Sequence, residues 1–136
     1  EVAGIKGRIV RIDEKVKASS YIGFGASKHV ASAVISYMTI YPPMRAGFNI
    51  KYDTKILDLL RTFMKISEYD RRLEPRQFKE KEGETIKWGI KNAILKDKIV
   101  NGIYHQGDLG KEPMIIIFGH KPAEILEYLR KIIKYY

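Results

Sequence analysis

The chain has 136 residues, a net charge of +9 and no cysteine, and this length corresponds to about one domain. The lack of cysteine excludes a disulfide framework, a zinc finger and thiol catalysis. The longest purely apolar run, residues 114–118, is too short to cross a membrane, and no secretory signal opens the chain. These features predict a soluble, cytoplasmic protein without a membrane partner. Because the first residue, Glu1, is not Met, we expect a piece of a longer polypeptide.

The positive charge is spread along the sequence rather than gathered in one segment. Residues 1–30 and 45–80 each carry an excess of cations, and only residues 105–120 are slightly acidic. No basic tail and no continuous basic helix is present, so the charge suits small anionic ligands at least as well as a nucleic acid. Nucleic acid is therefore not the expected partner.

The hydrophobic pattern predicts alternating strands and helices. In chain order, we expect a hairpin at 8–19, a helix at 27–41, a strand at 46–52, a helix capped by Asp53, a strand at 65–69, a polar loop at 71–83, a helix at 85–95, strands at 103–106 and 114–118, and a helix from Pro122. Since the hairpin makes a purely parallel sheet improbable, we predict an α/β fold with a mixed, partly antiparallel sheet and helices on both faces.

Apolar side chains at helical spacing mark the faces that should turn inward. These positions are Val30, Ala33, Val34, Tyr37, Met38 and Tyr41 in the first helix, Ile56, Leu59, Leu60 and Phe63 in the second, Ile86, Ile90 and Ile94 in the third, and Ile125, Leu126, Leu129, Ile132 and Ile133 in the last.

The segment from Gly23 to His29 is the most informative candidate site. Gly23 and Gly25 allow close approach of a ligand to the backbone, and Ala26, Ser27 and Lys28 lead into the first helix. The free N–H groups of a helix N-terminus favour a phosphate, and His29 exchanges a proton near neutral pH. The alternative is a plain loop in which Ser27 caps the helix. A Walker loop is excluded, because no Gly-Lys-Ser/Thr occurs.

Three other segments carry polar groups that could meet a phosphate. In residues 68–75, Arg71 and Arg72 could clamp a diphosphate while Asp70 or Glu74 holds a divalent ion; a surface salt-bridge cluster is the alternative. Residues 107–113 contain Asp108 and Lys111, and a plain turn explains this segment equally. The third pair is Arg45 and Asn49, four residues apart near the start of a strand.

For three residues with aromatic rings, the sequence context favours a structural role over a catalytic one. His105, in a predicted strand, is interpreted as structural, His120 as an exposed turn residue and Trp88 as part of the core. The three histidines lack close metal-ligand spacing, which argues against zinc.

Taken together, these segments resemble one family. The ordered set comprises Gly7 to Val10, Gly23 to Ala31, Arg45-Ala46 with Asn49-Ile50, Asp70 to Arg72 with Glu74-Pro75, and Gly107 to Met114. It is similar to the archaeal-type thiamine-phosphate synthase domain (ThiN) over almost the whole chain. The resemblance implies one domain over residues 1–136, with three α/β/α layers, that commonly forms the C-terminal part of a fusion with a hydroxymethylpyrimidine phosphate kinase.

The same resemblance implies an enzyme that joins hydroxymethylpyrimidine diphosphate to hydroxyethylthiazole phosphate, giving thiamine phosphate and pyrophosphate. It implies Mg²⁺, whose ligands stay unassigned, these two small-molecule substrates, and an upstream kinase domain; a homo-oligomer stays open. Arg8 and His29 match family positions expected to be catalytic. The expected phosphate-binding residues are Gly23, Gly25, Ala26, Ser27, Lys28, Arg45, Asn49, Asp70, Arg71, Arg72, Asp108 and Lys111. The alternative is a thiamine-phosphate-sensing domain of a transcriptional repressor.

Overall fold

A four-stranded mixed sheet forms the centre of the computed structural model, which describes residues 1–79 and 83–135. The strands lie in the order β5-β8-β7-β6. Their bounds are Ala46–Lys51 (β5), Ile66–Glu68 (β6), Gly102–His105 (β7) and Met114–Gly119 (β8). β6 and β7 are parallel, whereas β8 is antiparallel to both of its neighbours. The mixed, partly antiparallel sheet is therefore confirmed.

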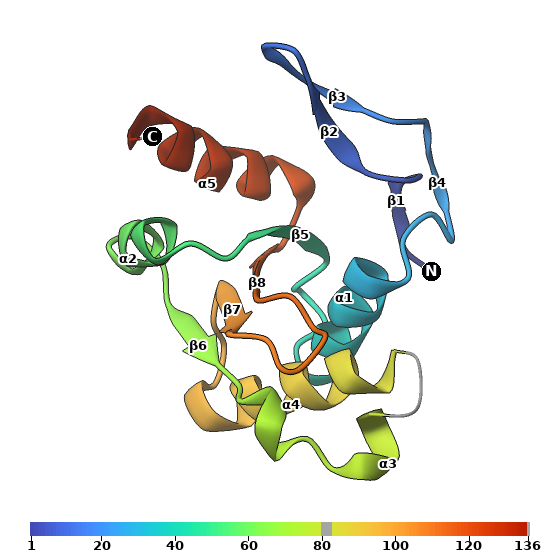
Figure 1. Ribbon diagram of the computed structural model, residues 1–136, viewed down its shortest axis with the longest axis vertical. Helices are drawn as coiled ribbons and strands as arrows, with labels where there is room; N and C mark the ends of the chain where they lie inside the picture. Colours follow the sequence, from blue (N-terminus) through green and yellow to red (C-terminus); the bar gives the residue numbers. More distant parts are fainter. Residues whose placement is uncertain (80–82, 136) are drawn as a thin grey trace.

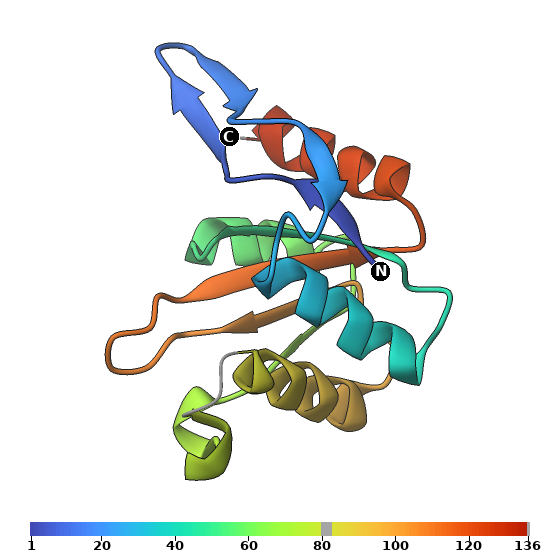
Figure 2. The same cartoon turned by 90° about the vertical axis from the view of Figure 1, so that its right-hand side faces the viewer.

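Helices cover both faces of this sheet and complete three layers (Figure 2). One face carries α1 (His29–Ile40) and α4 (Glu84–Asp97), and the other carries α2 (Thr54–Arg61) and α5 (Pro122–Tyr135). β8 shows why two helical layers are needed. Its residues Ile116 and Phe118 enter the core on the α1–α4 side, and Ile115 and Ile117 enter the core on the α2–α5 side, as the two-residue period of a strand requires.

The apolar stripe predicted for the first helix is confirmed at all six positions. Tyr37 is fully buried, and its hydroxyl both donates to the Val100 carbonyl at 2.8 Å and accepts from the Val100 N–H at 2.9 Å. The stripe predicted for the third helix is also confirmed, because Ile86, Ile90 and Ile94 of α4 are all buried. The stripe of the second helix holds in part. In α2 the buried residues are Leu57 and Leu60 rather than Leu59.

The last helix departs from its predicted face. Ile125 and Ile132 are buried, but Leu126 and Ile133 are exposed, the latter by 74%. Five apolar positions cover a wider arc of α5 than a single sheet contact can bury. No helix in the described ranges is long and apolar enough to span a membrane.

The N-terminal residues form an arm beside the sheet (Figure 1). β2 (Ile9–Ile12) pairs with β3 (Lys15–Ala18), and β1 (Ala3–Ile5) pairs with β4 (Ile22–Phe24). The predicted hairpin is thus confirmed, but it forms a separate two-stranded sheet. The mixed character of the central sheet comes from β8 and not, as the sequence interpretation had it, from this hairpin.

The segment predicted as a polar loop at 71–83 contains two short helices. They are η1 (Arg71–Leu73) and α3 (Arg76–Lys79). Asp70 starts η1, because its side chain accepts a hydrogen bond from the Arg72 N–H at 2.9 Å, a local bond that aspartate makes readily at helix starts. Residues 80–82 of the predicted loop lie outside the described residues.

Candidate active site

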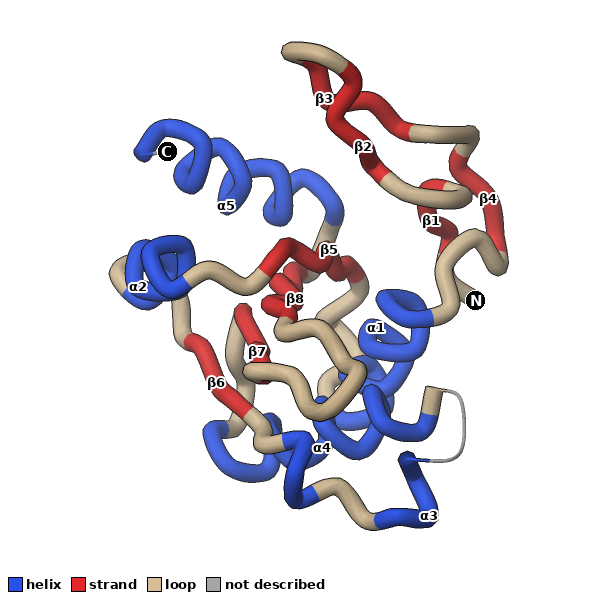
Figure 3. The backbone as a smooth tube through the Cα atoms, viewed as in Figure 1, coloured by secondary structure: helices blue, strands red, loops and turns tan. Residues whose placement is uncertain are grey.

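The candidate site lies where the parallel strands β6 and β7 end. Because the two strands are parallel, their carboxyl ends meet at one edge of the sheet. Tyr69 to Arg72 follow β6, His105 ends β7, and the turn at 107–111 leaves from the same edge (Figure 3). His29, the first residue of α1, is close enough to Arg71 for their charges to interact. The fold thereby gathers three of the four segments singled out by their composition.

Arg71 is the centre of this arrangement. Only 8% of the residue is exposed, and its Nη2 atom lies 3.8 Å from Oε2 of the equally buried Glu74. This distance exceeds that of a hydrogen bond. A buried guanidinium is stabilised only when its hydrogen bonds are satisfied, so this ion pair alone leaves Arg71 short of partners.

Four buried side-chain atoms in the described part of the chain have no hydrogen-bond partner, and all belong to this region. They are Tyr69 OH, Arg71 Nε, Glu74 Oε1 and His105 Nε2. The rings of Tyr69 and His105 lie 5.1 Å apart. Each unpartnered buried polar group costs roughly 1–3 kcal/mol, and their concentration at one place indicates a site for a polar ligand.

A glycine in α4 allows Tyr69 to lie at this position. A Cβ atom at Gly89 would approach the Tyr69 ring to 2.3 Å. The neighbouring Trp88 meets the same ring edge-on, with centroids 6.1 Å apart. Trp88 therefore packs against the core as predicted, while it also lines the cavity described below.

Both histidines of the site are held towards the neutral form. Burial lowers the pKa of His105 to about 4, with further lowering by the charges of Arg71 and His29. Burial also lowers the pKa of His29, followed by the charge of Arg71. Both imidazoles are thus neutral near pH 7.

Two ion pairs form the outer rim. Arg72 contacts Asp70 through bonds of 2.6 to 3.0 Å, and these bonds lower the pKa of Asp70 to about 2. Lys79 of α3 donates to Asp108 at 3.0 Å, which lowers the pKa of Asp108. Both carboxylates are ionised at neutral pH.

The turn at 107–111 is built on a glycine. Gly107 has φ +85°, and a Cβ there would approach the Lys111 carbonyl oxygen to 2.4 Å. Asp108 and Lys111 exchange backbone hydrogen bonds of 3.2 and 2.8 Å, so the turn fixes both residues beside the site. The Lys111 side chain is exposed.

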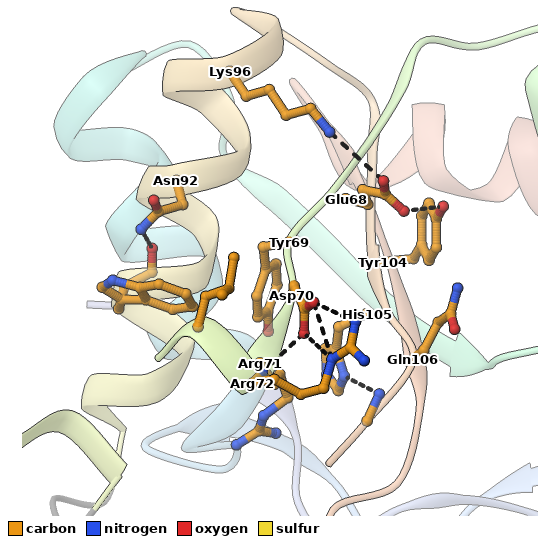
Figure 4. A pocket seen from close by; sticks show the side chains of 13 residues that line it. Glu68, Tyr69, Asp70, Arg71, Arg72, Asn92, Lys96, Tyr104, His105 and Gln106 are labelled. Atoms are coloured by element: carbon orange, nitrogen blue, oxygen red, sulfur yellow. Dashed lines mark hydrogen bonds and ion pairs between the residues drawn. The ribbon is translucent and has the colours of Figure 1, made fainter. Parts of the chain in front are cut away.

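A cavity of about 660 Å³ opens next to Arg71 (Figure 4). It lies between α4 and the ends of β6 and β7. Its polar and aromatic lining consists of Glu68, Tyr69, Asp70, Arg71, Arg72, Trp88, Asn92, Lys96, Tyr104, His105 and Gln106. The volume is that of a small-molecule site.

The glycine segment before α1 is only partly the loop that was predicted. Gly23 belongs to β4 and pairs with Gly4; Gly25 has φ +68° with open space around it. α1 begins at His29 rather than near Ser27, and Lys28 stands at its N-cap without a side-chain capping bond. The N-cap position is therefore occupied by Lys28 and not by Ser27, as the alternative interpretation of this segment had it. Ala26 and Ser27 are partly buried.

Arg8 lies in the arm, between β1 and β2. Its backbone N–H donates to Ser19 Oγ at 2.8 Å, and the side chain is exposed with no hydrogen bond or ion pair to the described residues. The Ser19 contact fixes the backbone here, since Ser19 Oγ also donates to the Lys6 carbonyl at 3.1 Å. Arg8 is thus presented on a defined turn, apart from the Arg71 cluster.

Arg45 and Asn49 are not brought to the Arg71 cluster. Ala46 pairs with Gly119, whereas His105 pairs with Met114 at the other end of β8. Five residues of strand separate the two positions by about 17 Å, so Arg45 lies beyond the opposite end of the sheet. Asn49 is exposed on the outer strand β5, on the face that Gly47 turns towards α1.

Sequence reasoning missed three contributors to this site. His105 was interpreted as structural, and Tyr69 and Lys79 were not considered. No local pattern marks them, because their significance depends on the parallel pairing of β6 with β7 and on α3, which was predicted as loop. His120 is exposed in a turn, as predicted, with Nδ1 3.0 Å from Glu124.

Comparison with known proteins decides the family. The family described as "Thiamine-phosphate synthase ThiN" matches residues 1–131. The chain belongs to the thiamine-phosphate synthase ThiN family. Thiamine-phosphate synthase ThiN of Methanothermobacter thermautotrophicus is 33% identical over all of this chain and 73% of its own length. The bifunctional thiamine biosynthesis protein ThiDN of Methanocaldococcus jannaschii is 35% identical, and this chain spans 32% of its length.

Solved structures agree with this assignment. The C-terminal domain of a phosphomethylpyrimidine kinase superposes with a TM-score of 0.89 at 47% identity, covering 96% of this chain and 74% of that one. A second C-terminal domain, with a TM-score of 0.86 and 34% identity, covers 97% and 71%. The resemblance to ThiN and the prediction of an enzyme are confirmed.

Proposed function

We propose that this thiamine-phosphate synthase domain joins hydroxymethylpyrimidine diphosphate to hydroxyethylthiazole phosphate at the Arg71 cluster. The thiazole nitrogen attacks the methylene carbon of the pyrimidine, the bond from that carbon to the diphosphate oxygen breaks, and pyrophosphate leaves. The observation that carries this assignment is the set of buried, unpartnered polar atoms around Arg71. Together with the family membership, it favours a site for a polyanionic leaving group.

The main task of such a site is to stabilise negative charge on the leaving oxygen. The aminopyrimidine ring is electron-rich and stabilises positive charge on the methylene carbon, so no nucleophilic side chain is required. Arg71 and Arg72 supply cations and bidentate donors that match phosphate oxygens, while Lys79 and Lys111 add charge at the rim. Donors fixed in advance, in a partly buried site, stabilise the charge without reorganisation.

His29 is proposed to donate a hydrogen bond to a phosphate oxygen. Its pKa is lowered in the free protein by burial and by Arg71, so the ring is neutral with one N–H. A bound diphosphate brings negative charge close to the ring and raises the pKa again. His29 can then protonate the departing pyrophosphate, a role that typically contributes a hundred- to ten-thousand-fold in rate.

The arm and the segment before α1 are proposed to bind the second phosphate. Arg8 presents a guanidinium that has no hydrogen bond or ion pair to the described residues. The backbone from Gly25 to Lys28 leads into the N-terminus of α1, where N–H groups favour an anion. Asn49, on the face towards α1, is the remaining polar candidate of this region.

The residues present fit Mg²⁺ bound through substrate phosphates rather than in a protein cage. No group of three metal-binding side chains occurs among the described residues, and magnesium commonly uses one or two carboxylates plus phosphate oxygens. The ionised Asp108 or Asp70 would hold it. When bound, the ion would neutralise charge on the diphosphate.

The relatives also bear on partners and location. One is bifunctional and another is the C-terminal domain of a kinase. We therefore propose that an attached kinase domain supplies the pyrimidine diphosphate, and that the protein works in the cytoplasm, where phosphorylated intermediates are retained.

The decisive experiment is turnover by this chain alone. Supplied with both substrates and Mg²⁺, it should release pyrophosphate and form thiamine phosphate in equal amounts. Omission of the thiazole phosphate is the control. Tight binding of thiamine phosphate without any turnover would refute the proposal and favour a sensor.

A further inference from the structure

The two ring nitrogens of His105 have different environments, and these define its tautomer. Nδ1 accepts a hydrogen bond of 3.1 Å from the Gly107 N–H. A ring nitrogen that accepts carries no hydrogen, so the neutral ring has its hydrogen on Nε2. The Gly107 N–H that makes this bond belongs to the first residue of the turn at 107–111.

The surroundings of His105 keep it neutral. The residue is 2% exposed, and the charges of Arg71 and His29 both disfavour an imidazolium. Tyr69 packs against the ring, and burial raises the pKa of its hydroxyl, so Tyr69 supplies no anion. The result is a neutral N–H donor close to the charged guanidinium of Arg71.

This donor has no acceptor in the part of the chain that the structure describes. His105 Nε2 and Arg71 Nε are both buried and unpartnered among the described residues. The acceptor that would satisfy two such donors at once is an oxygen atom of high charge density. Glu74 is the nearby anion, but its ion pair with Arg71 is long at 3.8 Å and Oε1 stays unpartnered.

We propose that His105 binds a phosphoryl oxygen of the diphosphate substrate and of the pyrophosphate product through Nε2–H, beside Nε of Arg71. The proposal deepens the proposed function and rests on it. Both atoms are covered in the free protein, so the ligand must shift the loosely paired Arg71 side chain towards itself. A neutral donor adds a hydrogen bond but no further positive charge. A further cation at this position would bind the pyrophosphate product more tightly and slow its release.

The direct test is nuclear magnetic resonance of the histidine rings, recorded through ¹⁵N–¹H couplings on the whole chain, with inorganic pyrophosphate and Mg²⁺ as the probe. The chain has three histidines, so each ring can be assigned by substitution. His105 should show the Nε2–H tautomer at pH 7, and its Nε2 signal should move on addition of pyrophosphate. The exposed His120 should not respond. An Nδ1–H tautomer, or a His105 signal that stays fixed at saturating pyrophosphate, overturns the proposal.

Substitutions give a second readout. His105→Phe keeps a flat ring and removes the donor, and pyrophosphate inhibition should weaken by about tenfold to a hundredfold, the range for a hydrogen bond to a charged group. His105→Gln retains an N–H donor and should recover part of the loss. His120→Phe is the matched control. Equal inhibition of the wild type and His105→Phe refutes the role of His105, whereas a chain that binds pyrophosphate through His105 without turnover refutes only the proposed reaction.

Discussion

Acid should destabilise this protein through His105. The pKa of its imidazole is about 4 in the folded protein and about 6.5 in an unfolded chain. The unfolded state therefore binds more protons between these values, and stability falls as the pH is lowered through this window. From pH 7 to pH 5 the His105 contribution amounts to a loss of about 2 kcal/mol in the free energy of unfolding. His29, whose pKa is also lowered, acts in the same direction.

Urea unfolding at several pH values between 7 and 5 measures this loss, and His105→Gln isolates it. Glutamine does not titrate, and its side-chain oxygen can still accept from the Gly107 N–H. All other titrating groups are common to both proteins, so the difference between the two curves reports His105 alone. The variant should lose about 2 kcal/mol less than the wild type over this range. Parallel curves would show that His105 is protonated as easily in the folded state as in the unfolded state, and would refute the reasoning.

The remaining predictions concern catalysis and the turn that supports His105. His29→Ala should lower kcat by about a hundred- to ten-thousand-fold with an unchanged unfolding midpoint; turnover close to the wild type would contradict the role. Arg8→Ala should impair catalysis strongly, and Arg8→Lys should restore it only in part, because a point charge replaces a planar fork; full activity of the lysine variant in steady-state kinetics would oppose a bidentate contact. Gly107→Ala should reduce the free energy of unfolding in urea by at least about 1–2 kcal/mol, since a side chain is strained at its positive φ and meets the Lys111 carbonyl. An unchanged midpoint would argue against this turn geometry.

Local patterns predicted most of the architecture. The stripe of α1 could be read from the sequence because six apolar residues recur at a single period. The prediction of the buried face of α5 was less accurate, because its apolar residues outnumber the positions that one sheet face can cover. Leu126 and Ile133 are therefore exposed. The short helices after β6 were missed because their residues are polar, and local capping by Asp70, rather than an apolar stripe, organises the first of them.

The residues of the candidate site differ more in whether the sequence alone could reveal them. Asp70 to Arg72 and Asp108 to Lys111 were recognisable from composition, and the fold brings them together because they follow adjacent parallel strands. Predicting the position of Arg45 requires the register of β5 on β8, and this register cannot be inferred from residue composition. The role of His105 was harder still to predict, since it depends on a hydrogen bond from the Gly107 N–H and on packing against a tyrosine 36 residues earlier in the chain.

The position of the Arg71 cluster follows from the one parallel pair in the described sheet. Antiparallel neighbours place opposite ends of adjacent strands at the same edge, whereas β6 and β7 present their carboxyl ends together, the arrangement at which α/β proteins commonly bind ligands. The segments that leave these ends, Tyr69 to Arg72 and the turn at 107–111, can therefore converge on a single ligand. α1 approaches the same edge with its N-terminus, so His29 faces Arg71 from a third element. His105 and Arg71 each leave a buried polar atom unpartnered among the described residues, which is costly without a ligand, and a polyanion that accepts from both removes that cost.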